Sequence, residues 1–235
     1  MKKSRTSLTV VFLIICMASG IITAAEIIDV NFENEMPGAQ TKSFSSFVGN
    51  WHIDKDGKNL VYAVDGRKWA RGTMSAGIAD KAKALYGERY AEFLDNLDAY
   101  KYFPLTIYQG IKNYKNGTIS VSFKSVSGRV DQAAGIAFNI KPNGDYLVIR
   151  ANPLENNIVA FKMERGHRSV VQWKRNVILK SNKWYSLKVV IKGNTVEGYL
   201  DNKLYISFKY KTKISGKIGL WSKADSYVFF DDFSS

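Results

Sequence analysis

A ladder of short apolar segments, separated by turn residues, dominates the chain from Tyr102 to residue 235. The segments favour extended strands, and pairs such as Gly193-Asn194 and Asp201-Asn202 mark tight turns between them. Many short strands at nearly regular spacing are typical of a β-sandwich or a jelly roll. We expect strands at residues 105–108, 117–125, 133–140, 146–151, 157–164, 170–173, 184–192, 195–200, 203–210, 216–223 and 227–233.

The part of the chain before Tyr102 combines further strands with one stretch of a different period. Apolar residues recur at spacings of three and four within residues 78–97, which indicates short helices. The absence of an internal repeat or a low-complexity linker favours a single domain over residues 26–235. The predicted fold is all-β, a jelly-roll sandwich of two antiparallel sheets with a helical insertion around 78–97. Its first strands are expected at residues 26–32, 48–53 and 60–64, with a loop at 35–46.

Residues 1–25 have the three-part pattern of a secretory signal peptide. Basic residues come first, an apolar run follows over residues 8–22, and the small residues Ala24 and Ala25 suit cleavage. The alternatives are an uncleaved membrane anchor and a lipoprotein attached through Cys16. Cleavage near Ala25 predicts a secreted or periplasmic protein with no remaining membrane span.

The chain is strongly basic, with 34 Lys and Arg against 21 Asp and Glu, a net charge of +13. Residues 26–235 carry +10, because the leader holds three of the basic residues and no acidic one. Such a surface attracts anionic partners. No dense basic run is present, so we expect no nucleic-acid binding. Cys16 is the only cysteine, so a mature monomer would have no disulfide and no cysteine-bound metal.

Residues 145–168 read as two strands joined by a polar bend that contains Glu155. Side chains two apart in a strand share a face. One face would then hold Tyr146, Val148, Arg150 and Asn152, and the other Leu147, Ile149 and Ala151. The polar end of the first face could read a ligand, or it could be the solvated side of an ordinary sheet.

Acidic residues lie close to both ends of the predicted domain. If residues 29–33 and 228–232 run side by side, their oxygen atoms would gather at one place. Oxygen ligands of this kind suit a structural calcium ion, the one cofactor that we consider. The alternative is that these acids face water or protect the sheet edge. The candidate ligands are Asn31, Glu33, Asp231 and Asp232.

Five stretches of the chain resemble a known group of secreted bacterial domains. They are VSGRVDQAAGIAF (126–138), YLVIRANPLENN (146–157), GHR (166–168), WYSLKVVIKGNTVEGYLDNKL (184–204) and GKIGLWSKADSYVFFDDF (216–233). The chain is similar in these motifs to concanavalin A-like lectin/glucanase domains, described as family 16 glycosidase-like or 3-keto-disaccharide hydrolase-like. The resemblance covers about residues 104–233 and implies a jelly roll of two antiparallel sheets.

The catalytic signature of the glucanases is missing from this sequence. Family 16 enzymes place Glu-x-Asp-x-(x)-Glu on one strand, so that their carboxylates face the same cleft. The acids Glu92, Asp95 and Asp98 fall in the expected helical stretch, where a solvated helix face explains them better. Whether the chain is an enzyme therefore stays open, and a non-catalytic role is favoured.

The sequence thus predicts a secreted carbohydrate-binding jelly roll whose ligand is a glycan, and the positive net charge favours an acidic one. Cationic and amide groups would bind hydroxyls or carboxylates, and Trp221 would either stack on a sugar ring or fill the sandwich. The first alternative is a glycoside hydrolase or lyase that uses Glu155 or Asp225. The second is a structural or protein-binding module of the cell envelope. The candidate ligand-binding residues are Arg150, Asn152, Glu155, Trp221, Lys223 and Asp225.

Overall fold

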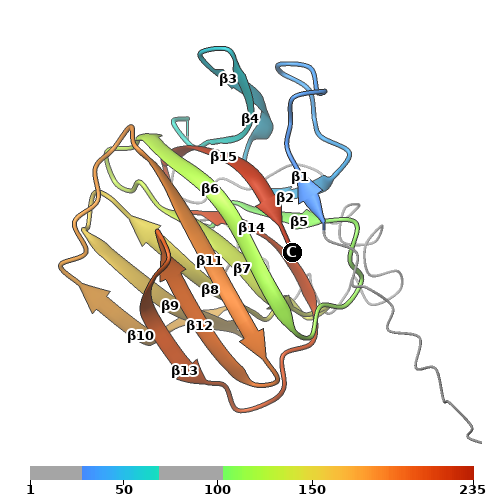
Figure 1. Cartoon of the computed structure of the whole chain (residues 1–235), viewed down its shortest axis with the longest axis vertical. Coiled ribbons are helices and arrows are strands. Elements are labelled where there is room, and N and C mark those ends of the chain that lie inside the picture. Colours follow the sequence, from blue (N-terminus) through green and yellow to red (C-terminus); the bar gives the residue numbers. More distant parts are fainter. Residues whose placement is uncertain (1–27, 69–102) are drawn as a thin grey trace, which may run out of the picture.

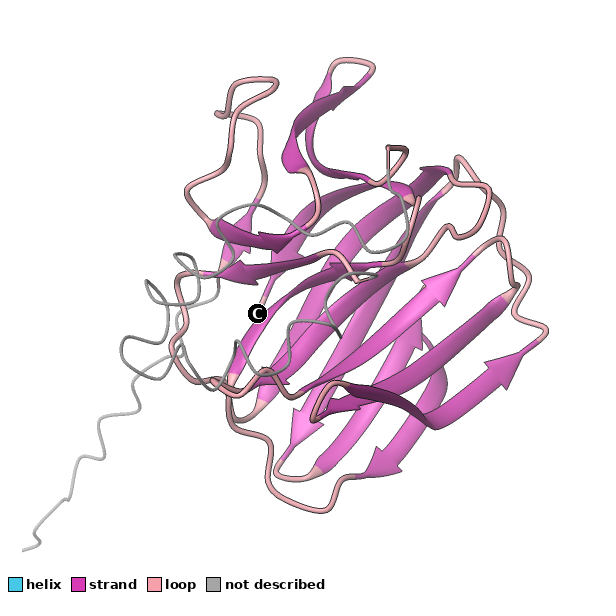
Figure 2. Ribbon diagram, turned by 180° about the vertical axis from the view of Figure 1, so that it is seen from behind, coloured by secondary structure: helices cyan, strands magenta, loops and turns pink. Residues whose placement is uncertain are grey.

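The computed structural model describes residues 28–68 and 103–235, and all regular elements in these ranges are strands (Figures 1 and 2). The predicted all-β class is confirmed. The strands are Asp29–Val30 (β1), Phe44–Val48 (β2), Trp51–Asp56 (β3), Asn59–Asp65 (β4), Leu105–Tyr108 (β5), Gly117–Ser127 (β6), Ala134–Ile140 (β7), Tyr146–Asn152 (β8), Asn157–Glu164 (β9), His167–Arg175 (β10), Trp184–Lys192 (β11), Thr195–Leu200 (β12), Lys203–Lys209 (β13), Lys217–Ser222 (β14) and Tyr227–Ser234 (β15).

The strands form two antiparallel sheets that pack face to face as a jelly-roll sandwich (Figure 1). The eight-stranded sheet has the order β13-β12-β11-β6-β15-β4-β3, and β1 pairs with β15 beside this path. The seven-stranded sheet has the order β10-β9-β8-β7-β14-β5-β2. The pairing of Val30 with Phe233 confirms that the two ends of the domain meet.

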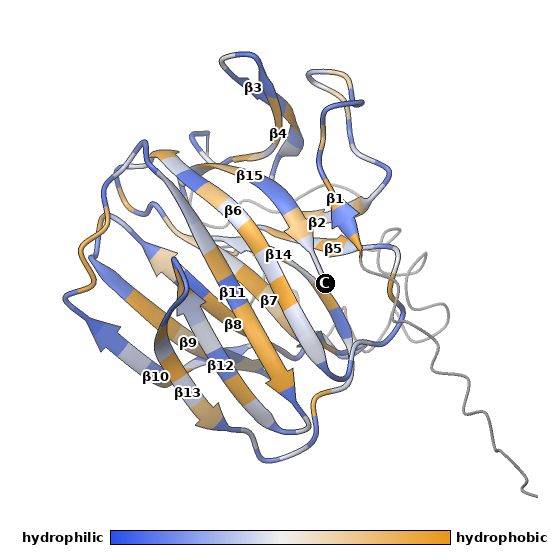
Figure 3. Cartoon of the chain, viewed as in Figure 1, coloured by the Kyte–Doolittle hydropathy of each residue, from blue (hydrophilic) through white to orange (hydrophobic). Residues whose placement is uncertain are grey.

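The main core lies between the two sheets and follows from alternation along their strands. In β11, Tyr185, Leu187, Val189 and Ile191 are buried, and the residues between them are partly exposed. Apolar and polar residues also alternate along β6 (Figure 3). A strand with one apolar face gains stability only when that face is covered, so this period of two brings the sheets together.

The seven-stranded sheet also carries a second apolar cluster on its outer face, which points away from the eight-stranded sheet. All residues of β7 and of β8 are buried, so these strands are covered on both faces. In β8, Tyr146 and Val148 belong to the outer cluster, and Leu147 and Ile149 belong to the main core. The predicted division of this strand into two faces is confirmed.

One predicted loop contains a strand in the structure, and two further predictions are not tested by it. Residues 44–48 form a strand of the seven-stranded sheet, although the polar sequence around them predicts a loop. Gly49, with φ of 94°, then turns the chain toward the other sheet. A side chain on residue 49 would collide with Pro104, so glycine is favoured at this turn. The predicted leader (1–25) and helices (78–97) lie outside the described residues. Within those residues, no helix has the length and hydropathy needed to cross a membrane.

Candidate functional site

A row of residues crosses the outer face of the seven-stranded sheet from its β10 edge. Directly paired residues in neighbouring strands point to the same face. The pairings of β10 with β9, β9 with β8, β8 with β7 and β7 with β14 therefore line up five side-chain positions. The row consists of Trp173, Val159, Arg150, Gly135 and Trp221.

Trp221 lies at the inner end of this row and is completely buried. Its ring stacks on Phe103 with 5.4 Å between centroids, and its Nε1 donates a hydrogen bond to the Tyr146 hydroxyl at 3.1 Å. The sequence left open whether Trp221 stacks on a ligand or fills the fold. In this structure the ring has no free face for a sugar, and it packs on the outer face of the sheet, not between the sheets.

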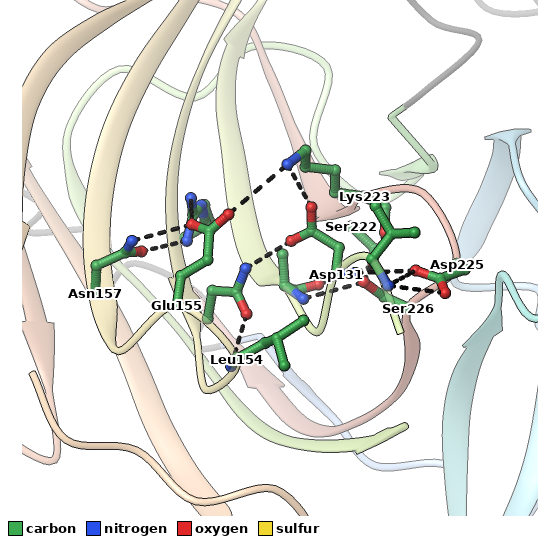
Figure 4. A network of polar contacts seen from close by, with 12 residues as sticks. Asp131, Leu154, Glu155, Asn157, Ser222, Lys223, Asp225 and Ser226 are labelled. Atoms are coloured by element: carbon green, nitrogen blue, oxygen red, sulfur yellow. Dashed lines mark hydrogen bonds and ion pairs between the residues drawn. The ribbon is translucent and has the colours of Figure 1, made fainter. Parts of the chain in front are cut away.

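Arg150 is buried in the middle of the row, and its charge is matched by Glu155 of the polar bend that follows β8. Figure 4 shows Glu155 together with Asn157, the other residue that binds this guanidinium. Its guanidinium donates hydrogen bonds to Asn157 Oδ1 and to Glu155 Oε2, the latter at 2.7 Å. Burial works to raise the pKa of Glu155, yet the hydrogen bond from Asn157 and the charge of Arg150 bring that pKa below its usual value. Glu155 is therefore held as a carboxylate beside the sheet.

A second acid, Asp131, joins this polar group from the loop before β7 (Figure 4). Its carboxylate accepts a hydrogen bond from Asn152 Nδ2 at 2.6 Å and forms an ion pair with Lys223. The Lys223 ammonium also lies 4.0 Å from Glu155 Oε1, so it bridges the two acids. Burial raises the pKa of Asp131, although Lys223 offsets part of this effect. The structure thus places Arg150, Asn152, Glu155 and Lys223 together, as the sequence predicts.

Asp225 holds a loop in place and does not point toward these groups (Figure 4). Its two carboxylate oxygens accept hydrogen bonds from the backbone N–H groups of Arg129, Val130 and Asp131 at 2.8–3.0 Å. Burial works against the charged form of Asp225, but these N–H groups bring its pKa below the usual value. These contacts show that Asp225 positions the loop that carries Asp131, and its predicted roles in ligand binding or catalysis stay predictions.

Trp173 is not among the ligand-binding residues predicted from the sequence, although the sequence offers it, as one of five tryptophans, as a possible platform for a sugar ring. It lies at the exposed end of the row, its side chain is on the outer face beside Val159, and 44% of the residue is exposed. Arg175 lies over the Trp173 ring at 4.8 Å. Strict alternation would place Trp173 on the same face as Val171, whose side chain packs against the main core. A β-bulge between Val170 and Gln172 reverses this and turns Trp173 outward.

The acids proposed for calcium contact protein groups. Asp231 Oδ2 accepts a hydrogen bond from Asn59 at 2.8 Å, Glu33 accepts one from a backbone N–H of β4, and Asp232 accepts one from a serine of β6. Burial raises the pKa of Asp231, which disfavours its charged form. In residues 28–68 and 103–235, no three His, Cys, Asp or Glu side chains gather as a metal site. Calcium binding by this group, including Asn31, stays a prediction.

Comparison with known proteins identifies the class of fold. No protein-family model and no curated protein matches the chain. Among solved structures, a carbohydrate-binding module, CBM66 from Bacillus subtilis, is 16% identical with a TM-score of 0.56, covering 85% of this chain and 95% of that one. A Bacillus licheniformis β-glucanase is 10% identical with a TM-score of 0.54, covering 88% and 96%.

A Bacillus subtilis protein of unknown function with a galectin-like fold is 12% identical, with a TM-score of 0.53 and coverage of 84% of this chain and 92% of that one. At such identities the similarity is one of fold. The fold is that of a concanavalin A-like lectin/glucanase jelly roll, as the C-terminal motifs predict.

Proposed function

We propose that this chain is a secreted, non-catalytic carbohydrate-binding jelly roll that binds a glycan on the outer face of the seven-stranded sheet. The observation that carries the proposal is Trp173, a half-exposed aromatic ring in register with the buried Arg150. Sugar rings present apolar C–H faces, and a fixed indole with one side open offers a surface that matches them. The carbohydrate-binding and glucanase names among the fold relatives favour the same class of ligand.

The polar groups beside the row would give the site its selectivity for hydroxyls. Glu155 is partly exposed and fixed by Arg150 and Asn157, so a free lone pair on its carboxylate can accept a hydrogen bond from a sugar hydroxyl. Lys223, also partly exposed, can donate to another. Because these side chains are held by one another, little conformational entropy is lost when a ligand binds.

A glycoside hydrolase is the second candidate, and one observation favours it. The pKa of Asp131 is raised and that of Glu155 is lowered. Two carboxyl groups whose pKa values are shifted in opposite directions suit a general acid and a nucleophile or base. Against this, the Asp131 side chain is fully buried and ion-paired with Lys223. We therefore rank binding first.

The test is a glycan screen of the purified protein, followed by calorimetric titration of each ligand found. We expect Trp173→Ala to weaken binding about 10- to 100-fold, the loss typical of an aromatic anchor worth roughly 1–3 kcal/mol. Trp184→Ala is the matched control, because Trp184 lies on the eight-stranded sheet and donates to Asp56 at 2.9 Å. That variant should bind as the wild type does.

Three results would count against this proposal. The protein could bind no glycan, or Trp173→Ala could bind as tightly as the wild type. Release of shorter sugars from a polysaccharide by the wild type, but not by Glu155→Gln, would assign hydrolysis to the site. Thermal unfolding of each variant shows whether the fold is kept.

A further inference from the structure

Arg168 lies on the same outer face as Trp173, closer to the start of the edge strand β10. It pairs with Met163, which pairs with Tyr146, and both belong to the outer apolar cluster. Its guanidinium lies over the rings of Phe103 and Phe161, at 5.0 Å and 4.8 Å from their centroids. Two aromatic contacts thus fix the direction of this exposed cation.

The charge of Arg168 has no acidic partner among residues 28–68 and 103–235. Its close contacts are the two aromatic rings, and the charges of Asp131 and Glu155 act on it from beyond ion-pair distance. Arg150 and Lys223 on this face are paired with Glu155 and Asp131. Arg175, which lies over the Trp173 ring, resembles Arg168 in having no ion pair with the described residues. A guanidinium without a carboxylate, fixed in place on a protein face, is a site for an anion.

A second arginine, Arg150, adds positive charge near Arg168. Arg150 also lies over the Phe161 ring, at 5.5 Å, and the pairings of Arg150 with Val159 and of Arg168 with Met163 place the two arginines on opposite sides of Phe161. The Nε of Arg150 is buried and has no hydrogen-bond partner, although the other nitrogens of the group are paired with Asn157 and Glu155. Because this nitrogen is not exposed, a ligand on this face would contact Arg168 directly and Arg150 only through its charge.

We propose that the glycan is anionic and that a sugar carboxylate binds to the exposed guanidinium of Arg168 beside Phe161. This inference rests on the proposed glycan binding and adds the class of ligand. Because of the bulge, Trp173 and Arg168 pair with Val159 and Met163, which are four residues apart, or roughly 13 Å along a strand. One sugar ring cannot contact both side chains, so the ligand is a uronate-containing oligosaccharide that lies along β10.

The test compares uronate oligosaccharides with their methyl esters, which keep the sugar and remove the charge. Galacturonate, mannuronate and glucuronate oligomers are each titrated as acid and as ester against the full protein. We expect the wild type to prefer at least one acid about tenfold or more over its ester. Arg168→Gln should bring this ratio close to one while the affinity for the ester stays the same, and Arg168→Lys should keep part of the preference.

Lys174→Gln is the control for loss of charge, because Lys174 lies on the same strand but pairs with Ile158 of the main core face. It should keep the acid preference. Equal affinity for every acid and ester, or a preference that survives in Arg168→Gln, would overturn the inference and leave glycan binding intact. Binding that does not depend on Trp173 would overturn the proposed function itself, so the two failures can be told apart.

Discussion

Asp225 shows how one carboxylate organises the site from a distance in sequence. It lies directly after the strand that carries Trp221, yet it binds three successive N–H groups of the loop that leads into β7. That loop ends in Asp131, whose buried carboxylate needs a fixed position to meet both Asn152 and Lys223. The sequence indicates that Asp225 belongs near the site, but only these contacts reveal a supporting role.

We expect Asp225→Asn to lower the free energy of unfolding by about 1–2 kcal/mol near neutral pH. The amide keeps an acceptor but loses the charge that strengthens the bonds to N–H groups, and partial exposure limits the effect. Asp29→Asn removes the same charge from an exposed position and should change little. Urea denaturation measures both variants.

The pH dependence of this difference has a definite sign. The pKa of Asp225 is lowered by folding, so its contribution is present above the unfolded pKa of about 3.9 and is lost as the pH falls through the folded value. The gap between wild type and Asp225→Asn should therefore shrink below about pH 4. A gap that stays constant from pH 7 to pH 3 would show that the charge of Asp225 is not the cause.

At the scale of elements, close packing on the outer face of the seven-stranded sheet requires a small residue in the middle of the row from Trp173 to Trp221. Gly135 of β7 lies between Arg150 and Trp221, and a Cβ there would be 2.9 Å from Arg150 Cβ and 3.0 Å from Val148 Cγ2. The large side chains on both sides leave no space for a methyl group. A glycine inside a buried strand therefore marks the place where the site residues approach most closely.

We expect Gly135→Ala to cost about 1–3 kcal/mol of stability, as overpacking does in a filled interior. Because the added methyl pushes against Arg150, glycan affinity should fall as well. Ser186→Ala on β11 serves as the control, since this side chain is partly exposed on the other sheet and should change stability by less than about 0.5 kcal/mol. A stability of Gly135→Ala equal to that of the wild type in chemical denaturation would contradict the packing shown here.

At the scale of the whole molecule, the basic charge acts on every encounter with a ligand. Residues 26–235 carry +10, and the fixed acids of the site, Asp131 and Glu155, are each matched by a cation. The long-range field of the protein thus favours approach of anions, and it is screened by salt. Charge of this kind changes association rates more than dissociation rates.

We expect the association rate of a uronate oligosaccharide to fall about tenfold between roughly 20 mM and 500 mM salt, because the Debye length shrinks from above 20 Å to below 5 Å. The methyl ester of the same oligosaccharide should associate at an almost constant rate. Surface plasmon resonance at several salt concentrations measures both. A salt effect of equal size for acid and ester would mean that the net charge does not steer the ligand.

The sequence alone determined the features that depend on local periodicity. A period of two along the chain predicted most strands, the two faces of β8 and the grouping of Arg150 with Asn152. This period did not predict β2, because the residues around it are polar and the strand becomes buried only through its pairing with β5. Alternation tells which side chains share a face but not which strand lies beside them.

Only the tertiary structure decided which residues form the site and which merely support it. The bulge in β10 that turns Trp173 outward depends on the register with β9, and nothing in the local pattern marks it. The burial of Trp221 and the anchoring of Asp225 require partners distant in sequence, such as Phe103 and the loop before β7. Periodicity is a property of neighbouring residues, whereas exposure and pairing arise when distant strands meet.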